Sequence, residues 1–486
     1  QIGSDTVIKE GSNYLATLTG ITASNITILD FQSTSTDDQT FNGTSGNDTL
    51  IGGAGDDTFN GGAGSDTLLG WSGDDTFNIT GKSGAYTDTI LGGSGTNVLN
   101  ISYVSDLSNF TISAIPTSDS VISLTDPNGG SIKFTNILDY TYTSGAAGYW
   151  DGSITVNGKV YNFVSDMRYD KTPFSGAYGS VQAFVYENPS NTVEVVIPSD
   201  GKWLPQYRMS SYKGFAFDGN ETFTIYGGSG SEVIFGGYQG DTITGGDGND
   251  YIFGGDGADT IDAGAGDDVV YTSKAGLTED ISIKGGLGSN TLVFDKPGES
   301  GGWDNESYGA ITFNLGTELG NATDFQNIGG GGSDDTLTGD SNANVIIGAG
   351  GNDTLYGGDG NDSLYGDEHP NDTGGTVYGI REYSLSDGND SLYGGDGNDA
   401  LYGSDGNDTL DGGAGTDTLT GGSGIDTFVL RSGDGGASQA AGDTITDFAD
   451  GTDSLGLDSS LLFSDLTIEQ IGSDTVIKEG SNYLAT

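Results

Sequence analysis

A nine-residue repeat in residues 387–429 constrains the fold of this chain more than any other sequence feature. Its aspartates recur at every ninth position, and two positions after each of them comes a Leu or Phe. Paired glycines open most units, so each unit divides into a six-residue turn that needs φ > 0 positions and a three-residue strand with one inward side chain. No unit can bury that side chain alone. The repeat therefore predicts stacked units in a parallel β-helix, with an inner apolar ladder and a line of aspartates outside it.

The aspartates of such a stack would repel one another. Stacked strands lie about 4.8 Å apart, and at an effective dielectric near 20 each neighbouring pair of carboxylates would repel by about 3 kcal/mol. A hard divalent cation in an all-oxygen site would offset this, and calcium tolerates irregular six- to eight-fold coordination better than magnesium does. The alternative is a disordered glycine-rich tract, since glycine and aspartate both disfavour strands. We expect order with calcium and disorder without it, because the strict apolar phase would serve no purpose in a coil.

The pattern G-G-x-G-x-D-x-U-x, in which U is a large aliphatic residue, resembles the nonapeptide of the repeats-in-toxin (RTX) family of secreted calcium-binding proteins. The resemblance implies a parallel β-roll with two nonapeptides per turn. It also implies that calcium lies between successive turns, held by the aspartate carboxylate of each unit and by backbone carbonyls of the glycine-rich loops. Family members leave bacteria by type I secretion, so the resemblance implies an extracellular or cell-surface location.

Three blocks of repeats supply the candidate calcium ligands. We call them the first roll (43–100), the second roll (227–271) and the third roll (330–429), the last interrupted by a loop at 366–386. Because the ions of the family bridge one turn to the next, the blocks together predict roughly a dozen calcium ions. Glu232 and Asn344 stand where the family has aspartate, and Asp88 and Asn97 fit the repeat pattern only loosely. Weaker sites are therefore expected at these four positions. The predicted ligands are Asp48, Asp57, Asp66, Asp75, Asp241, Asp250, Asp259, Asp268, Asp335, Asp353, Asp362, Asp390, Asp399, Asp408, Asp417 and Asp426.

Composition narrows the partners and the chemistry. The chain has 15 basic and 70 acidic residues, a formal net charge of −55. Nucleic acid and anionic membranes are therefore not expected as partners, whereas multivalent cations are. Cysteine is absent, which excludes disulfides, thiolate chemistry and cysteine-based zinc sites. No apolar run is long enough to cross a membrane as a helix, so no membrane insertion is expected.

Residues 101–225 differ in character from the rolls. Glycine becomes rarer, and alternating segments such as SITVNGKVYNFV predict antiparallel strands joined by NGK-type turns. We interpret this segment as a β-sandwich-like domain inserted between two rolls, and 272–329 as a β connector. Its aromatic residues suit either sugar stacking or an ordinary β-domain core, the second being the commoner use. They are Tyr140, Tyr142, Tyr149, Trp150, Tyr161, Tyr169, Trp203, Tyr207 and Tyr212. The predicted fold class is thus all-β, with parallel β-roll segments and one antiparallel insert.

The two ends of the chain carry the same sequence. Residues 1–17 recur letter for letter as 470–486, a period of 469 residues. We interpret the chain as slightly more than one period of a tandem array. In this hypothesis 430–486 begin a capping β unit, and 1–32 are the end of such a unit. Residues 18–32 would then complete the cap of the preceding copy. The alternative is a mature protein whose ends are duplicated.

Two classes of function remain open. The chain is not expected to be an enzyme, because His369 is its only histidine, the H-E-x-x-H motif is absent, and no pair of acids is singled out as catalytic. The identical ends favour a calcium-stabilised structural protein that associates with itself, head-to-tail or laterally, in a filament, sheath or surface layer. The other class is an adhesin module that binds polysaccharide or a cell-surface receptor through 101–225.

Overall fold

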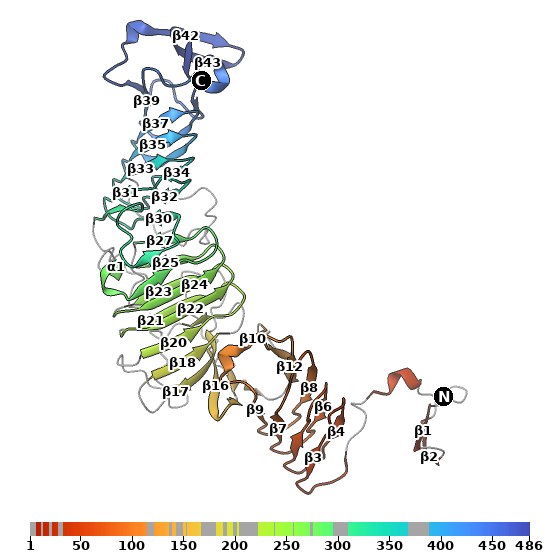
Figure 1. The fold of residues 1–486 in the computed structure, drawn as a ribbon. Helices are drawn as coiled ribbons and strands as arrows, with labels where there is room; N and C mark the ends of the chain where they lie inside the picture. The colour runs from red at the N-terminus through yellow and green to blue at the C-terminus, as the bar shows by residue number, and fades with distance from the viewer. Residues whose placement is uncertain are drawn as a thin grey trace. The chain divides into compact units, whose positions relative to one another are not determined.

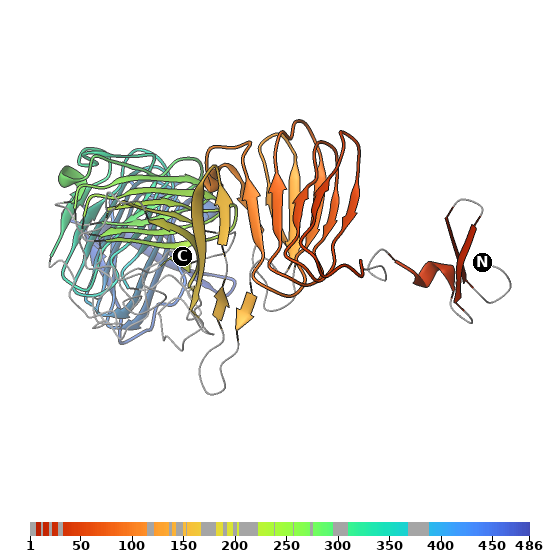
Figure 2. The same cartoon turned by 90° about the horizontal axis from the view of Figure 1, so that it is seen from below.

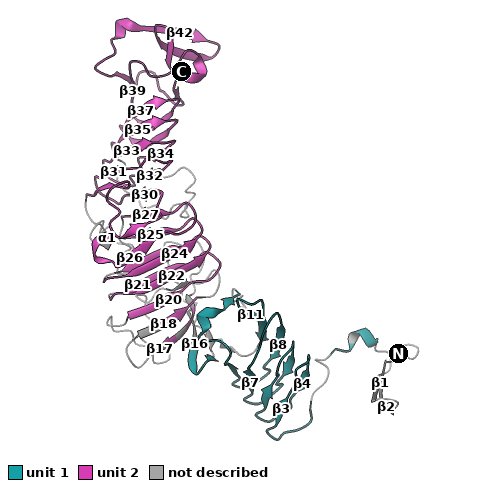
Figure 3. Cartoon of the chain, in the orientation of Figure 1, with its two compact units in different colours: residues 1–142, 149–163 teal, residues 143–148, 164–486 magenta. Residues whose placement is uncertain are grey.

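The computed structural model describes residues 6–10, 13–18, 22–27, 33–113, 121–135, 139–141, 149–151, 153–166, 181–187, 192–197, 202–203, 222–237, 239–255, 257–272, 276–294, 310–367 and 388–486. The described chain is almost entirely β, with a single short α-helix, α1 (Gly276–Glu279). It forms two compact units, residues 1–142 with 149–163 and residues 143–148 with 164–486 (Figure 3). The all-β prediction is confirmed.

The third roll alternates its strands between two parallel sheets (Figure 1). One sheet contains β28 (Thr312–Asn314), β31 (Thr336–Thr338), β33 (Thr354–Asp359), β35 (Ser391–Gly397), β37 (Thr409–Gly415), β39 (Thr427–Leu430) and β41 (Ser454–Leu457). The other contains β32 (Val345–Ile347), β34 (Ser363–Tyr365), β36 (Ala400–Gly406), β38 (Thr418–Gly424) and β40 (Thr444–Ile445). Neighbours such as β35 and β37 pair residues 18 positions apart. One turn therefore holds two nonapeptides, which confirms the β-roll.

The apolar residue of each unit builds the core, as the repeat predicts. Leu392 pairs with Leu410 in one sheet and Leu401 with Leu419 in the other, and all four side chains are fully buried. The inserted loop does not break this ladder, because β33 and β35 stay in register although 37 residues separate their partners. Most of the predicted loop 366–386 lies outside the described residues.

The second roll continues into the third. Its sheets contain β20 (Thr222–Tyr226), β22 (Thr242–Asp247) and β24 (Thr260–Ala265), and, facing them, β21 (Val233–Gly237), β23 (Tyr251–Gly255) and β25 (Val269–Tyr271). The predicted connector adds β26 (Ser282–Lys284) and β29 (Ala322–Thr323) to the first of these sheets and β27 (Thr291–Val293) and β30 (Asn327–Gly329) to the second. One apolar core runs from Ala183 to Phe428. The connector is therefore part of one continuous roll, because its strands extend both ladders in register.

The first roll lies in the other unit. Its sheets contain β3 (Thr40–Asn42), β5 (Thr58–Asn60), β7 (Thr76–Ile79) and β9 (Val98–Ile101), and β4 (Thr49–Ile51), β6 (Thr67–Leu69) and β8 (Thr87–Leu91). Figure 2 shows these strands side by side. Phe41, Phe59 and Phe77 stack through its core with ring centroids 5.1 and 4.9 Å apart. Aromatic stacking thus adds to the area buried by the ladder.

The described strands of 101–225 extend the rolls, which differs from the predicted separate sandwich domain. β12 (Ser131–Thr135) pairs parallel with β8, and β15 (Ser153–Val156) pairs parallel with β9. In the other unit, β18 (Thr192–Val196) pairs parallel with β20. Each then forms an antiparallel pair, with β11 (Ile122–Thr125), β16 (Lys159–Asp166) and β17 (Val181–Glu187) respectively, and β10 (Thr111–Ile112) follows β11. An open roll end offers unpaired backbone groups, and these strands cover it. The unit boundary accordingly falls inside the predicted insert.

One predicted turn is confirmed within this segment. β15 and β16 form an antiparallel hairpin through Asn157 and Gly158, which have φ of 47° and 84°. Two consecutive positive φ values are those of a type I′ turn, which Asn-Gly favours. Tyr161 on β16 is fully buried, and its hydroxyl accepts a hydrogen bond from the Leu107 N–H at 3.4 Å. This aromatic residue of the predicted belt is a core residue.

The two identical ends fold into the same hairpin. β1 (Thr6–Glu10) pairs with β2 (Asn13–Leu18), and β43 (Asp474–Glu479) pairs with β44 (Asn482–Ala485). The register shifts at the same place in both, between Ile8 and Lys9 and between Ile477 and Lys478. At the C-terminal end β42 (Leu466–Ile471) adds a third strand. Among the described residues, no helix is long and apolar enough to span a membrane.

Candidate metal-binding ladder

The repeat aspartates form two lines along the third roll. Each aspartate immediately precedes a strand, and its Oδ1 accepts the backbone N–H of the aspartate one turn earlier. On one side the N–H of Asp353 donates to Asp390 at 2.7 Å and that of Asp390 to Asp408 at 2.9 Å. On the other side the N–H of Asp362 donates to Asp399, and that of Asp399 to Asp417, both at 2.8 Å. One carboxylate oxygen of each residue is therefore used to join successive turns.

The second carboxylate oxygen has no such partner. In the described part of the chain, ten aspartates bury an Oδ2 that neither donates nor accepts a hydrogen bond: Asp75, Asp88, Asp250, Asp268, Asp353, Asp362, Asp390, Asp399, Asp408 and Asp417. Buried carboxylates without a partner are costly, and folded proteins rarely leave them so. A row of them points to a shared positive ligand.

A backbone carbonyl of a neighbouring turn lies near several of these oxygens. A Cβ built on Gly348 would lie closer than 3.0 Å to both Asp353 Oδ2 and the carbonyl oxygen of Gly366. A Cβ on Gly394 would meet Asp399 Oδ2 and the Gly412 carbonyl in the same way. Glycine is required at these positions because the space beside the backbone belongs to two oxygens. The result is a repeated pair of one carboxylate and one carbonyl oxygen.

Burial shifts the acidity of these carboxyls. Desolvation, partly offset by the N–H bond to Oδ1, raises the pKa of Asp353 to about 9 and the pKa of Asp390 and Asp408 to about 7. The same cause raises the pKa of Asp399 and Asp417 to about 6. The protein interior alone thus disfavours the ionised form, and a cation beside Oδ2 would restore it.

These residues fit calcium. Carboxylate and carbonyl oxygens are the ligands that this hard cation takes, and its flexible coordination suits a site made mostly of backbone. No group of three or more His, Asp or Glu side chains is placed to hold a metal anywhere in the described residues.

The structure places each predicted ligand in an aspartate ladder of its own roll, but the surroundings of these ligands differ. Asp48, at the start of the first roll, is only half-buried, and its Oδ2 accepts hydrogen bonds from the Thr44 N–H and hydroxyl at 2.6 and 2.9 Å. Oδ2 of Asp57 and of Asp335 accepts a loop N–H at 2.9 and 2.8 Å, and Oδ2 of Asp241 accepts one at 2.5 Å. Predicted ligands near the start of a block therefore have backbone donors in place of a free oxygen. The other predicted ligands are buried, and they are Asp66, Asp75, Asp250, Asp259, Asp268, Asp353, Asp362, Asp390, Asp399, Asp408, Asp417 and Asp426.

Four aspartates of the ladder are missing from the predicted set. Oδ1 of Asp88, Asp280 and Asp443 accepts the N–H of Asp66, Asp259 and Asp417 at 2.9, 3.0 and 3.0 Å respectively. Asp453 accepts the N–H of Asp426 at 3.2 Å. Asp443 and Asp453 each begin an Asp–Thr/Ser–apolar triplet, which is the sequence signal that identifies them. They lie 26 and 27 residues from their ladder partners, so a nine-residue spacing does not predict them.

Two ladder positions carry Asn344 and Glu232 in place of an aspartate. Asn344 Oδ1 accepts the N–H of Asp340 at 2.8 Å, while its Nδ2 donates to the Gln326 carbonyl at 2.7 Å. Its amide nitrogen thus lies where other units place an oxygen. Glu232 is fully buried, and its Oε2 accepts the N–H of Gly228 at 2.9 Å. The weaker sites expected at these positions stay a prediction.

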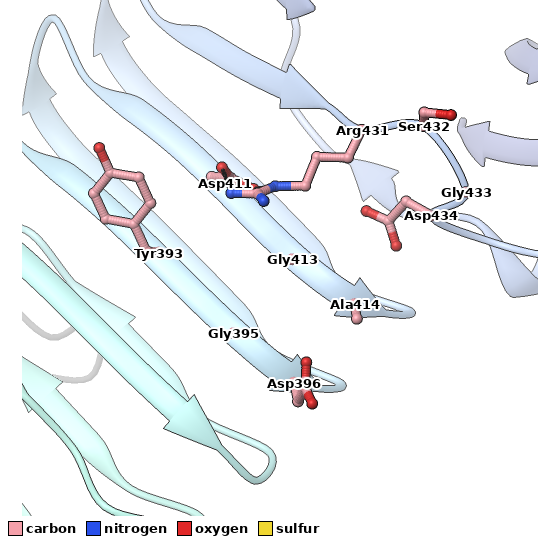
Figure 4. Close-up of a pocket in the computed structure, with 10 residues that line it drawn as sticks. All are labelled: Tyr393, Gly395, Asp396, Asp411, Gly413, Ala414, Arg431, Ser432, Gly433 and Asp434. Atoms are coloured by element: carbon pink, nitrogen blue, oxygen red, sulfur yellow. Dashed lines mark hydrogen bonds and ion pairs between the residues drawn. The ribbon is translucent and has the colours of Figure 1, made fainter. Parts of the chain in front are cut away.

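A shallow hollow of about 340 Å³ lies at the end of the third roll (Figure 4). In the register of the strands, Asp411 follows Tyr356 and Tyr393, so it ends a tyrosine stack. The Arg431 guanidinium binds Asp411 with two nitrogens, Nε donating to Oδ1 at 2.7 Å. A fixed cation of the protein already neutralises this carboxylate. The hollow is therefore not part of the free-oxygen ladder.

Comparison with known proteins identifies the repeats. The family model described as the RTX calcium-binding nonapeptide repeat (4 copies) matches residues 42–77, 224–243, 235–270, 329–364, 385–410 and 393–428. These segments contain every predicted calcium ligand. No curated protein matches the chain significantly. Among solved structures, the extracellular lipase LipA from Serratia marcescens is 18% identical, with a TM-score of 0.15, over 65% of this chain and 34% of its own. The chain thus spans about a third of that protein.

Proposed function

Because the chain is an RTX β-roll protein carrying calcium-binding repeats, we propose that it is a calcium-stabilised extracellular structural protein that associates with itself in a filament, sheath or surface layer. In this proposal the chain represents one period of a tandem or polymerising array, exported by type I secretion. The observation that carries self-association is the C-terminal cap. It repeats the N-terminal hairpin and leaves apolar strands open.

Calcium provides the stability of the unit. Six aspartates of the third roll, from Asp353 to Asp417, bury a carboxylate oxygen that has no protein partner. An ion that binds only the folded roll stabilises it by mass action, by about 2.7 kcal/mol per site at a hundredfold excess over Kd. Roughly a dozen divalent ions would neutralise less than half of the net charge of −55. Further calcium is then available to bridge neighbouring molecules.

The cap exposes apolar side chains on two strands and the turn between them. Phe463 is 72% exposed and Leu462 62%, and both lie between β41 and β42. Leu455 on β41 and Ile468 on β42 are exposed as well. β41 and β42 are edge strands of their sheets, so their outer backbone groups are open to pairing. An apolar edge of this kind is suited to another chain.

We assign a second copy of the chain as the occupant of this cap. The N-terminal hairpin leads into residues 18–32, LTGITASNITILDFQ, which alternate polar residues with Leu, Ile and Phe. The C-terminal hairpin has the same sequence as the N-terminal one, so residues 18–32 of a following copy are the natural continuation of this cap. Such a contact is head-to-tail and generates an open array.

Negative-stain electron microscopy of the full chain in millimolar calcium, and again after chelation, tests the proposal. We expect filaments or sheets in calcium that disperse on chelation. The double variant Leu462→Ser/Phe463→Ser should prevent assembly while leaving the calcium-bound fold intact, because both side chains are exposed. Leu287→Ser, which removes a leucine that is 75% exposed far along the roll from the cap, is the matched control. Dispersed wild-type particles in calcium would reject self-association.

The alternative functions remain predictions. Apart from Tyr161, the side chains of the proposed aromatic belt in 101–225 lie outside the described residues, so no contact in the structure favours an adhesin. Glycan-array binding by the full chain would favour it. The expectation that the chain is not an enzyme also stays a prediction, and it is checked by assaying the calcium-loaded protein for esterase and glycosidase activity.

A further inference from the structure

One turn of the first roll contains a lysine whose ammonium group lies inside the aspartate ladder. Asp66 and Asp88 are neighbours in the ladder but 22 residues apart, four more than the usual turn. The additional residues form an exposed turn in which Gly81 and Gly84 have φ of 65° and 72°. Lys82 lies between these glycines and points inward, and its side chain is only 1% exposed. The insertion therefore places a cation in the interior of the repeat.

The ammonium group contacts three oxygens. Lys82 Nζ lies 2.9 Å from Asp66 Oδ2, 3.0 Å from Asp88 Oδ1 and 2.9 Å from the carbonyl oxygen of Gly64. A lysine has three N–H donors, and each of them has an acceptor here. The ring of Tyr86 covers the group, with its centroid 5.1 Å from Nζ. No donor of this buried ammonium is left without a protein acceptor.

These oxygens are of the same kinds as those beside the free Oδ2 atoms of the third roll. They are one carboxylate oxygen from each of two successive turns and one carbonyl of a glycine-rich loop. In the third roll the corresponding Oδ2 atoms, such as that of Asp399, have no partner in the described protein. Asp66 Oδ2 differs because it has Lys82. At this turn a cation of the chain itself occupies the space between the two carboxylates.

We propose that the Lys82 ammonium takes the place of a calcium ion between Asp66 and Asp88, so that this turn of the first roll closes without metal. The proposal rests on the assignment of calcium to the other turns in the proposed function. An internal cation is always present at its site, so this turn does not depend on the calcium concentration. The first roll then has a segment around β6 and β8 that can order before calcium is encountered.

The surroundings of this turn support the same conclusion. Oδ2 of Asp48 accepts donors from Thr44, and Oδ2 of Asp57 accepts the Gly53 N–H at 2.9 Å. Among the described residues of this unit, only Asp75 and Asp88 bury an Oδ2 without a partner. With Lys82, three consecutive repeat aspartates, Asp48, Asp57 and Asp66, have an Oδ2 that accepts hydrogen bonds from the protein itself.

Two variants of the full chain test the proposal. Lys82→Ala opens the cradle, and Lys82→Arg keeps a cation in it. Lys133→Ala is the control, because Lys133 is an exposed lysine on β12 of the same unit and its loss changes the net charge equally. Hydrogen exchange of peptides covering β6, β7 and β8 is measured in chelator and in calcium, and bound calcium is counted by equilibrium dialysis with elemental analysis.

We expect wild type, Lys82→Arg and Lys133→Ala to protect these peptides in chelator. Lys82→Ala should exchange at least tenfold faster in chelator, recover its protection in calcium and bind one more calcium ion per chain. The additional ion is the readout that a lysine with only a packing role would not produce.

Three results would overturn the proposal. In the first, Lys82→Ala matches Lys133→Ala in both exchange and calcium count. In the second, Lys82→Ala stays unprotected in saturating calcium, which means that calcium does not fit the cradle. In the third, Lys82→Arg gains the additional ion. If the wild-type chain bound no calcium, the calcium assignment itself would fail, whereas normal wild-type binding with no effect at Lys82 would remove only this inference.

Discussion

The first and third rolls are built from the same repeat but satisfy their buried carboxylates differently. In the first roll, Asp48, Asp57 and Asp66 direct Oδ2 at protein donors, namely Thr44, Gly53 and Lys82. In the third roll, six aspartates between 353 and 417 bury an Oδ2 with no partner. The nonapeptide therefore fixes where a carboxylate lies, while its neighbours decide whether it needs a metal. The two rolls should differ in their dependence on calcium.

The largest expected difference follows from removal of calcium. A hundredfold excess over Kd contributes about 2.7 kcal/mol per site, so the loss of several sites is comparable to the usual stability of about 5–15 kcal/mol for a whole domain. The third roll should lose its amide protection in chelator, and the peptides around Lys82 should keep theirs. Hydrogen exchange with mass spectrometry measures both in one sample. Equal loss in the two rolls would remove the distinction drawn between them.

The pH dependence of the calcium-free protein should be the next largest effect. The pKa is raised from 3.8 to about 9 for Asp353 and to about 7 for Asp390 and Asp408. A carboxyl whose pKa is higher in the folded state stabilises the fold when protonated, fully below the unfolded pKa, and this stability is lost as pH rises through the folded pKa. The melting temperature of calcium-stripped protein should therefore rise from pH 8 to pH 5.

Calcium should reverse this sign, because protons compete with the ion for the same oxygens. Calcium affinity should accordingly fall between pH 8 and pH 5. Circular dichroism melts in stripped and calcium-loaded protein, together with calcium titrations at both pH values, test the two directions. A calcium-free melting temperature that is highest at pH 8 would contradict the buried, uncompensated state of the third-roll carboxylates.

Gly394→Ala should destabilise the third roll by an intermediate amount. Gly394 has no positive φ, so the change tests space and not backbone strain, and its Cβ would collide with Asp399 Oδ2 and the Gly412 carbonyl. Overpacking costs about 1–3 kcal/mol, and one calcium ion per chain should also be lost. Gly46→Ala in the first roll is the control, since its nearest neighbour would be Thr44 Oγ1 at 3.6 Å. Urea unfolding in calcium and the calcium count should separate the two variants.

Replacing a ladder aspartate by asparagine should change the stability of the calcium-free protein in opposite directions in the two rolls. Asp399→Asn removes an uncompensated buried charge, so it should stabilise the calcium-free third roll and weaken the calcium-loaded one by up to about 2.7 kcal/mol. Asp57→Asn replaces the charge-assisted hydrogen bond from the Gly53 N–H by a neutral one. This should destabilise the first roll by about 1 kcal/mol with or without calcium. Thermal melts of both variants in chelator and in calcium measure this. The same sign at both positions in chelator would show that their carboxylates are equivalent.

Arg431→Gln should have the smallest effect. The Arg431 side chain is 44% exposed, and ion pairs in contact with solvent contribute about 1 kcal/mol or less. The number of bound calcium ions should not change, because Asp411 lies on a strand and not in the ladder. Calcium counting and a chemical melt check this, and the loss of an ion would place Asp411 among the calcium ligands.

The ladder could be predicted because its determinants are local. A fixed Asp-x-apolar spacing decides which side chain points inward and which residue precedes the strand, and the structure confirms this from Phe59 to Phe428. Asp443 and Asp453 were missed because longer loops separate them from their partners, and loop length is invisible to a periodic search. The predicted sandwich differs from the structure because an antiparallel pattern does not say which edge a strand joins. β12, β15 and β18 join roll edges.

The sequence by itself determined that the chain is a calcium-type β-roll, since two nonapeptides per turn bring the same residues into line at every turn whatever the rest of the chain does. Only the tertiary structure decided which carboxylate oxygens remain without a partner. That depends on contacts across turns, as between Lys82 and Asp66 or between Asn344 and Gln326. It also decided that the connector joins the second and third rolls in one core. Burial and partner choice are set by packing between distant segments, and no local pattern encodes them.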